Sequence, residues 1–371
     1  MELSDALWAL ESGFCLWVGA GITKQVAAGK ASVPLWDQVA HEMESVAGVE
    51  PFEDEDVPTR LDRCLHAIGG DAFGSHLREW FYTDLSAGLL SHAVEFVDAE
   101  DFVPQHLRSI AALGQLANPI VSFNIEPLSS LLLARPAGPF RILFQSATAK
   151  PTYTWRELGG RFQRIVYHPH GLATADSVMT ASQYKSNRET LAFRLAIHAA
   201  FGNTLAIVGM SLDDKYLRHQ IKKSRTSLGD VYWFGEEFPD KLANWASQHR
   251  IETVQVHWPE FWNRWRELPV DIASSDLCSA WYLAVSEATE EVEGGFFGGL
   301  LRGLLNRPGA VPQNLLTLAE HMAVAGRNAG EPARPRLVNG REPRSIELAV
   351  KKRMQDAGIP IPVISKTPRV T

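Results

Sequence analysis

The chain has 371 residues, of which 45% are hydrophobic and 21% charged, a composition typical of globular proteins and not of disordered ones. The net charge of −7 disfavours nonspecific nucleic-acid binding by the chain as a whole, and three cysteines are too few for a disulfide framework or a four-cysteine zinc site. No apolar run is long enough to cross a bilayer and the first residues do not resemble a signal peptide, so we expect a cytoplasmic protein without membrane contact.

The first strong pattern is the apolar run at residues 14–18, which ends in Gly-Ala-Gly at residues 19–21. Such a run predicts a buried parallel strand, and glycines at its carboxyl end let backbone amides approach a phosphate. The third glycine of the Rossmann dehydrogenase fingerprint is absent, because Lys24 occupies that position. The turn is therefore a candidate for nucleotide binding that needs support from the rest of the chain.

Helical and strand patterns alternate after this turn, as in a parallel sheet with helices on both faces. The helices are expected at residues 4–11, with Ser4 or Asp5 as cap, and at 37–46, 60–90, 104–116, 262–268 and 279–288. The further strands are expected at residues 119–123, 162–167, 204–208, 231–234 and 253–257. The predicted fold class is α/β, with a Rossmann-like parallel sheet.

Four of the predicted strands are followed directly by glycine or polar residues. These are the Gly-Ala-Gly turn at residues 19–21, Asn124, His170 and Gly-Met-Ser at residues 209–211. Ligands of open parallel sheets bind outside the carboxyl ends of the strands. We therefore expect these four strand ends to converge on one cleft.

The strand pattern stops near residue 260. We predict one domain at residues 1–265 and a helical or irregular C-terminal extension at 266–371, with a linker inside residues 290–345. From Leu301 onward the chain carries 12 Lys and Arg against 5 Asp and Glu. A basic tail on an acidic body is usually a solvated linker, although it also offers a docking segment for a partner or for nucleic acid.

The order of the motifs resembles the sirtuin (silent information regulator) superfamily, and more closely its bacterial NAD-consuming branch found in phage-defence systems. The similar segments are Gly-Ala-Gly-Ile-Thr at residues 19–23, Pro-Leu-Trp at 34–36, Phe-Asn-Ile-Glu at 123–126, His-Gly at 170–171, Thr-x-x-x-Tyr at 180–184 and Gly-Met-Ser-Leu-x-Asp at 209–214. The resemblance covers roughly residues 10–260. It implies that NAD contacts Gly19, Ala20, Gly21, Ile22, Thr23, Trp36, Glu126, Gly209, Ser211 and Asp214.

Two features depart from the family pattern. Glu126 stands where the family usually has Asp, which lengthens a side chain expected near the nicotinamide or its ribose, whereas Thr23 in place of Ser keeps the hydroxyl. Protein deacylases of the family carry a zinc module with paired Cys-x-x-Cys, and this sequence has no such pair. The resemblance thus implies a domain without zinc and favours cleavage of NAD over protein deacylation.

The bond between nicotinamide and ribose breaks without an acid, because nicotinamide leaves as a neutral molecule. The transition state needs stabilisation of an oxocarbenium-like sugar and a positioned nucleophile. We expect the amide of Asn124 to position water or a ribose hydroxyl, and His170 to remove a proton. His168 competes for the role of base, and the adjoining Gly171 favours His170.

The resemblance also suggests how the rest of the dinucleotide is bound. The amides of residues 20–22 are expected at the pyrophosphate, and Ser211 at the adenosine ribose or a phosphate. Structural interpretations stand beside these: Asn124 is typical of a turn, a lone histidine is usually a surface or hydrogen-bonded residue, and Asp213 and Asp214 are equally typical of a helix cap.

The leading hypothesis is an NAD glycohydrolase that yields nicotinamide and ADP-ribose, and the resemblance implies an NAD-depleting effector of abortive infection against phage. Control by homo-oligomerisation or by a partner is expected, with the contact after residue 260. The resemblance implies a hexameric DNA-translocating ATPase or a short Argonaute-type protein, and nucleic acid only indirectly or through the basic tail. The alternatives are an NAD- or nucleotide-binding regulatory or scaffold subunit without turnover, and a zinc-free NAD-dependent deacylase.

Overall fold

The computed structural model describes residues 1–27, 33–51, 55–77, 80, 105–126, 129, 132–133, 140–144, 164–171, 177–186, 191–266 and 268. The extension predicted at 266–371, its linker, its basic tail and the helix expected at 279–288 lie outside these residues, apart from Arg266 and Leu268.

Seven parallel strands form one sheet in the order β3-β4-β2-β1-β5-β6-β7. The strands are β1 (Phe14–Val18), β2 (Ala117–Ser122), β3 (Phe140–Phe144), β4 (Arg164–His168), β5 (Leu205–Val208), β6 (Val231–Gly235) and β7 (Ile251–Gln255). The structure confirms the predicted α/β class with a Rossmann-like parallel sheet. The strand β3 at the sheet edge is an addition, since no strand was expected there from the sequence.

Without the edge strand β3, the order has the same topology as the 3-2-1-4-5-6 order of doubly wound folds. The chain moves from β1 toward β2 on one side and later returns to β5 on the other side of β1. In such sheets the crevice for a ligand lies at the carboxyl ends of the strands where this order reverses. That place is occupied here by the turns after β1 and β5.

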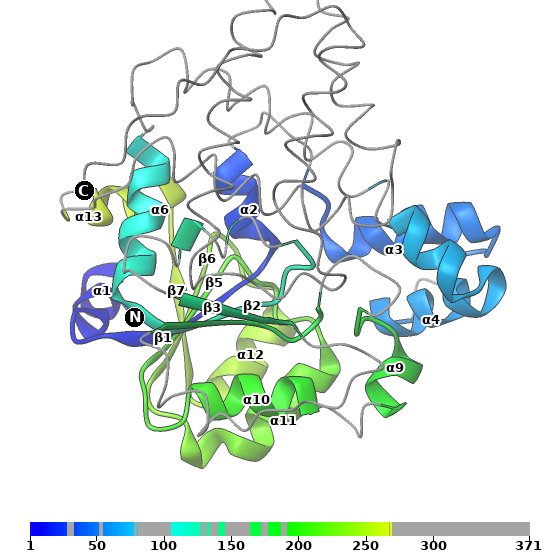
Figure 1. Cartoon of the computed structure of the whole chain (residues 1–371). Coiled ribbons are helices and arrows are strands. Elements are labelled where there is room, and N and C mark those ends of the chain that lie inside the picture. The colour runs from blue at the N-terminus through cyan, green and yellow to red at the C-terminus, as the bar shows by residue number, and fades with distance from the viewer. Residues whose placement is uncertain are drawn as a thin grey trace, which may run out of the picture.

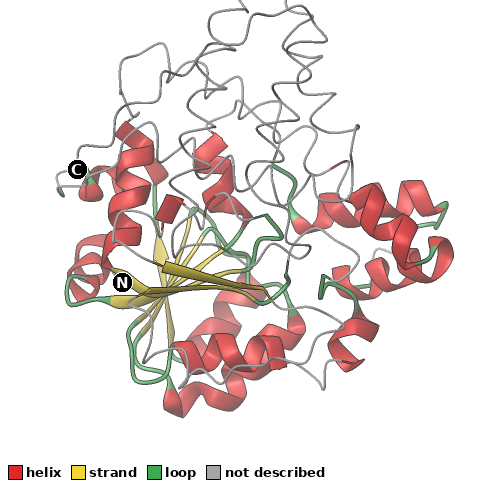
Figure 2. Ribbon diagram, in the orientation of Figure 1, coloured by secondary structure: helices red, strands yellow, loops and turns green. Residues whose placement is uncertain are grey.

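Helices cover both faces of the sheet (Figures 1 and 2). One face carries α1 (Leu3–Leu10), α2 (Ala20–Ala27), α6 (Gln105–Leu116) and α13 (Trp258–Trp265), and the other carries α10 (Leu191–Ala199), α11 (Lys215–Ser224) and α12 (Asp240–Gln248). The side chains of β1 explain this arrangement, because Phe14, Leu16 and Val18 enter one core and Cys15 and Trp17 enter the other. A strand buried on both faces reads as a continuous apolar run.

Two more helices, α3 (Trp36–Ala47) and α4 (Val57–Ile68), pack together beside the sheet, next to α9 (Ala181–Ser186) (Figure 1). The single helix expected at residues 60–90 is wrong. Helix α4 begins earlier because the Asp56 side chain accepts the Thr59 N–H as an N-cap, and it ends at Gly69, whose φ is 81°.

Two other helix boundaries differ from the prediction. Helix α1 begins at Leu3 with Glu2 at its N-cap position, and not at Ser4 or Asp5. Helix α13 begins at Trp258, before the expected residue 262, because a proline in its first turn needs no hydrogen-bond partner for its nitrogen. In the described part of the chain no helix has the length and apolar character required to cross a membrane.

Candidate functional site

The turns after β1 and β5 pack backbone against backbone. A Cβ atom on Gly21 would lie 2.7 Å from the Cα of Gly209, and a Cβ on Gly19 would lie 2.6 Å from the Gly209 carbonyl oxygen. Gly209 itself has a φ of 67°, a conformation that favours glycine. Glycine is thus required at these positions so that the two turns can pack in contact, apart from any role of the predicted nucleotide-binding turn in binding a ligand.

This contact uses backbone amides that were expected to meet a pyrophosphate. The Gly21 N–H donates to the Gly209 carbonyl at 3.0 Å, and the Ile22 N–H donates to the Gly19 carbonyl at 3.1 Å. In this structure these two amides are already paired within the protein, and their binding to a phosphate stays a prediction. The pairing of the Gly21 N–H is tertiary, because the β5 turn supplies an acceptor that the local sequence of residues 19–23 does not reveal.

Asn124 lies just beyond β2 and is 6% exposed. Its Nδ2 donates to the Gly19 carbonyl at 3.2 Å, to Thr23 Oγ1 at 2.9 Å and to Ser129 Oγ at 3.1 Å. Because a carbonyl oxygen only accepts, the Gly19 contact fixes which end of the amide faces α2. The amide oxygen Oδ1 points away from these partners and remains an acceptor for a ligand.

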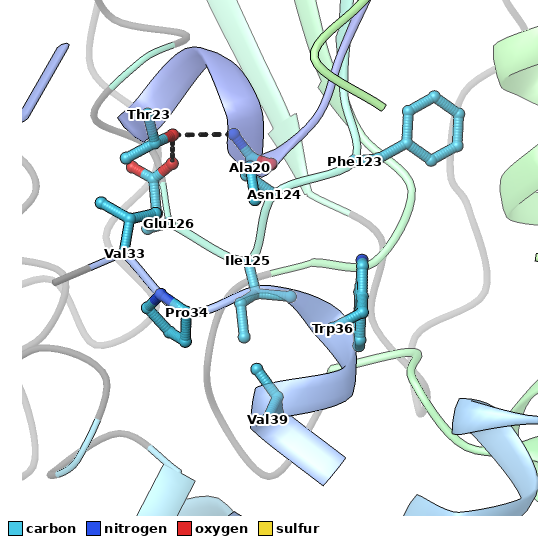
Figure 3. Close-up of a pocket in the computed structure, with 10 residues that line it drawn as sticks. All are labelled: Ala20, Thr23, Val33, Pro34, Trp36, Val39, Phe123, Asn124, Ile125 and Glu126. Carbon is cyan, nitrogen blue, oxygen red and sulfur yellow. Dashed lines mark hydrogen bonds between the residues drawn. The ribbon is translucent and has the colours of Figure 1, made fainter. Parts of the chain in front are cut away.

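A buried carboxylate holds the two hydroxyls that contact Asn124. Thr23 Oγ1 donates to Glu126 Oε1 at 2.5 Å, and Ser129 Oγ donates to the same oxygen at 3.4 Å. Figure 3 shows the Thr23, Asn124 and Glu126 side chains turned toward one another. The carboxylate thus fixes the direction of the two hydroxyl protons and leaves their oxygens to accept from the amide.

An open pocket of about 330 Å³ lies beside this network (Figure 3). It is lined by Ala20, Thr23, Val33, Pro34, Trp36, Val39, Phe123, Asn124, Ile125 and Glu126. Five of these residues were predicted for the site, namely Ala20, Thr23, Trp36, Asn124 and Glu126. The lining is mainly apolar with a few convergent polar groups, which is typical of small-molecule sites.

His170 follows β4 and is 3% exposed. Its ring packs edge-on against Trp36 at 5.0 Å between centroids and against Phe123 at 5.8 Å, and both of these residues line the pocket. Its Nδ1 donates to the Val178 carbonyl at 2.8 Å, which leaves Nε2 without a proton in the neutral ring. The structure therefore brings His170 to the wall of the pocket that Asn124 lines.

His168, the competing base, is fully buried within β4. Its Nδ1 faces the backbone carbonyl of Asn124 at 3.0 Å, and burial lowers its pKa to about 4. Burial also lowers the pKa of His170, but the Asp214 carboxylate opposes this shift. His170 contacts two rings that line the pocket, and this contact favours it as the base.

The last two predicted contacts lie away from the pocket. Ser211 is exposed, and its hydroxyl accepts the Asp213 N–H at 3.3 Å. Asp214 caps α11, because its Oδ1 accepts the backbone N–H groups of Tyr216 and Leu217 at 2.7 and 2.9 Å. The structural interpretation of Asp214 as a helix cap is confirmed.

Sequence reasoning did not identify three contributors to this site. Ser129 shares Glu126 with Thr23, Val178 supplies the carbonyl that fixes the His170 tautomer, and Phe193 packs against the His170 ring at 5.5 Å. Ser129 is only three residues from Glu126, and a search for hydroxyls near the carboxylate would have found it. Nothing in the local pattern marks Val178, because it contributes through its backbone.

Within the described ranges, no group of three or more His, Cys, Asp or Glu side chains is arranged to hold a metal ion.

Residues 143–254 match the family model of the SIR2-like domain. This segment runs from the end of β3 almost to the end of β7 and includes His170 and Asp214. The match supports the resemblance to the sirtuin superfamily. None of the curated proteins matches the chain.

Among solved structures, one described as "Structural Basis for the Mechanism and Regulation of Sir2 Enzymes" is similar over 72% of this chain and 97% of that chain, at 15% identity and a TM-score of 0.34. So low a score adds nothing to the match of the family model.

Proposed function

We propose that residues 1–265 form an NAD glycohydrolase, which cleaves the bond between nicotinamide and ribose to give nicotinamide and ADP-ribose. One observation carries this proposal: Asn124 lines the pocket beside the β1 turn, and His170, 46 positions later on another strand end, packs against Trp36 and Phe123, which line the same pocket. The match to the SIR2-like domain supports NAD as the substrate.

The two side chains have complementary capacities. The Asn124 amide is held through Nδ2, so its oxygen is available to accept from the attacking water or from a ribose hydroxyl. His170 presents an unprotonated Nε2 when neutral, which can remove a proton from either of these. Nicotinamide leaves as a neutral molecule, so no acid is required, and the remaining demand is to position the nucleophile against the oxocarbenium-like sugar.

The lining of the pocket suits the rings at one end of the dinucleotide, because it is mainly apolar with a few convergent polar groups. We assign it to nicotinamide and its ribose, with Trp36, Phe123 and Ile125 as apolar contacts for the rings. The adenosine half would then extend past the packed β1 and β5 turns, toward the exposed Ser211.

The biological role proposed is depletion of cytoplasmic NAD during abortive infection by phage. Such an activity must be held in check in a healthy cell, so we propose control by homo-oligomerisation or by a defence partner bound through residues beyond 260. A hexameric DNA-translocating ATPase and a short Argonaute-type protein are the partner classes to test. Size-exclusion chromatography that found only monomers with full NAD turnover would argue against control by assembly.

The test is release of nicotinamide from NAD by the purified full chain, with and without an acylated peptide. We expect release without peptide, and we expect Asn124→Ala and His170→Ala each to slow it by about 10²-fold or more. His198→Ala is the matched control, since His198 is exposed on α10, and it should keep the wild-type rate. Wild-type rates in both site variants would overturn the assignment of the site.

The same assay separates the alternatives. Release that depends on the acylated peptide would indicate a deacylase, and binding of NAD without release would indicate a regulatory or scaffold subunit. Addition of the partner protein to the assay distinguishes an inactive chain from one that awaits activation.

A further inference from the structure

We propose that Tyr184 and Asp214 are positioning residues for His170: together they hold its Nδ1 in the protonated form and stabilise the imidazolium that forms when Nε2 takes a proton. This inference rests on the proposed function for the role of Nε2. It adds a pair of residues from two other elements, α9 and the start of α11, to the residues around the pocket.

The directions of the hydrogen bonds carry the first step. Tyr184 Oη lies 3.2 Å from Asp214 Oδ2, and because a carboxylate only accepts, the phenol donates its single proton there. The phenol oxygen is then left to accept from His170 Nδ1, which lies 3.4 Å away. The Val178 carbonyl at 2.8 Å is the stronger partner of the same Nδ1. Both neighbours of Nδ1 are acceptors, so the proton belongs on Nδ1 and the lone pair on Nε2.

The position of Asp214 carries the second step. A helix cap needs one carboxylate oxygen, and Oδ1 fills that role by accepting the N–H groups of Tyr216 and Leu217. The other oxygen, Oδ2, is committed to Tyr184. The positive end of the α11 dipole favours the charged form of a carboxylate at this place. Asp214 is thus a carboxyl group that is held in place at both oxygens and connected to His170 through one hydroxyl.

Electrostatics act in the direction that the geometry requires. Burial lowers the pKa of His170, and the Asp214 carboxylate raises it in opposition. Burial raises the pKa of Asp214, and His170 lowers it in return. The other titratable groups near the pair are His168 on β4, Tyr216 on α11, and Asp56, which is paired with Lys215. The titratable group that raises the pKa of His170, and so favours its protonated form, is Asp214.

Aromatic rings restrict the alternatives open to the imidazole. Trp36, Phe123 and Phe193 pack against the edge or face of His170 at 5.0, 5.8 and 5.5 Å between centroids, and Tyr184 lies 5.2 Å from Phe193. Among these rings only Tyr184, through its hydroxyl oxygen, offers an acceptor for the proton on Nδ1, since the Trp36 indole N–H only donates. Rotation of the ring away from Tyr184 and Val178 would therefore leave Nδ1 unpaired in an apolar surrounding, which is costly.

Two substitutions remove the proposed effect while they keep the fold. Tyr184→Phe removes the hydroxyl and keeps the ring contacts with Phe193 and Tyr216. Asp214→Asn removes the charge and keeps an N-cap of similar strength, so α11 retains its start. The matched control is Asp56→Asn, which changes the aspartate that caps α4 and pairs with Lys215. Thermal melting of the variants checks that the fold survives.

The first readout is titration of the His170 imidazole in the full chain by nuclear magnetic resonance, with the signal assigned from its loss in His170→Gln. We expect the pKa of His170 to fall by about one unit in Asp214→Asn, to fall less in Tyr184→Phe, and to hold its wild-type value in Asp56→Asn. The nitrogen shifts of the wild type should show the proton on Nδ1 at high pH. An unchanged His170 titration in both variants overturns the proposal, whether or not the protein cleaves NAD.

The second readout is the pH dependence of kcat/KM for nicotinamide release. A base that is easier to deprotonate is also weaker, so Asp214→Asn should move the acidic limb to lower pH and reduce kcat by about tenfold or more, with a smaller change in KM. If Asp214→Asn turns over NAD and the acidic limb of its kcat/KM profile lies at the wild-type pH, the result counts against the proposal. If His170 titrates as expected but the wild type releases no nicotinamide even with its partner, the positioning of His170 stands and the proposed glycohydrolase fails.

Discussion

Alanine at position 21 would place a methyl group against the backbone of the neighbouring turn. Its Cβ would lie 2.7 Å from Gly209 Cα and 3.0 Å from the Gly209 carbonyl oxygen, whereas ordinary contact begins at 3.4 Å. The clash is with backbone, so no side chain can rotate away to relieve it. The turns after β1 and β5 would have to separate, and the hydrogen bond from Gly21 to the Gly209 carbonyl would lengthen.

Two effects of opposite sign decide the magnitude. Overpacking of this kind costs about 1–3 kcal/mol. Alanine is favoured over glycine inside a helix by about 1 kcal/mol at most, and Gly21 lies in the first turn of α2, where the gain is smaller. We therefore expect Gly21→Ala to reduce the free energy of unfolding by about 2 kcal/mol, which corresponds to a fall in Tm of roughly 4–8 °C for a domain of this size.

Gly70→Ala provides the matched control. Gly70 is also helical, and nothing lies within 4 Å of the place where its Cβ would be. The same substitution there should be neutral or stabilise the protein by about 0.5–1 kcal/mol. Chemical and thermal unfolding of the two variants beside the wild type measures the difference. Equal stability of Gly21→Ala and Gly70→Ala would refute the argument that the β1 and β5 turns require glycine because they touch.

Two further predictions concern groups outside the pocket. Arg60→Met leaves the buried Glu44 carboxylate without its main partner at 2.7–2.8 Å and should cost about 3–5 kcal/mol by urea unfolding, whereas a loss below about 1 kcal/mol would contradict this. Arg60 lowers the pKa of Glu44, so the stability that this ion pair contributes is present above pH 4.5 and is lost as the pH falls below that value. Glu44→Gln should therefore make the free energy of unfolding less dependent on pH in this range. Burial raises the pKa of Cys64 to about 11 and raises that of Cys15 further, so with Cys278→Ser neither thiol should react with a disulfide reagent at pH 7.5 until the protein unfolds. Rapid labelling of the folded variant would contradict that placement.

The strands were the most predictable part of the fold. Residues 14–18 and 205–208 are continuous apolar runs because both of their faces are buried, and such runs stand out in a sequence. The edge strand β3 was missed, since Phe-Arg-Ile-Leu-Phe at 140–144 follows a Pro- and Gly-containing segment and includes a charged residue. The break at Gly69 was missed for a related reason: hydrophobic periodicity continues across it, and only the backbone conformation ends α4.

The positions of Asn124 and His170 could be predicted because topology alone brings the ends of parallel strands to one edge. The hydrogen-bond partners of these side chains could not be predicted. The hydrogen bond from the Gly21 N–H to the Gly209 carbonyl depends on how closely the two turns pack, and the hydrophobic periodicity of a sequence does not predict such distances. The resemblance placed Glu126 at the ligand, and the structure places it in the pocket lining, but the hydrogen bond that it accepts from Thr23 could not be predicted.

The two side chains proposed to act on the substrate are held by the same kind of arrangement. Asn124 is bonded to the Thr23 hydroxyl, which donates to Glu126, and His170 contacts the Tyr184 hydroxyl, which donates to Asp214. In each case the hydroxyl donates its hydrogen bond to a carboxylate, so the hydroxyl oxygen can only accept a hydrogen bond from Asn124 or His170. The Asn124 nitrogen and His170 Nδ1 are thereby both occupied as donors, which leaves the amide oxygen and Nε2 as acceptors. In the proposed reaction these two acceptors would orient and deprotonate the water molecule that attacks the sugar.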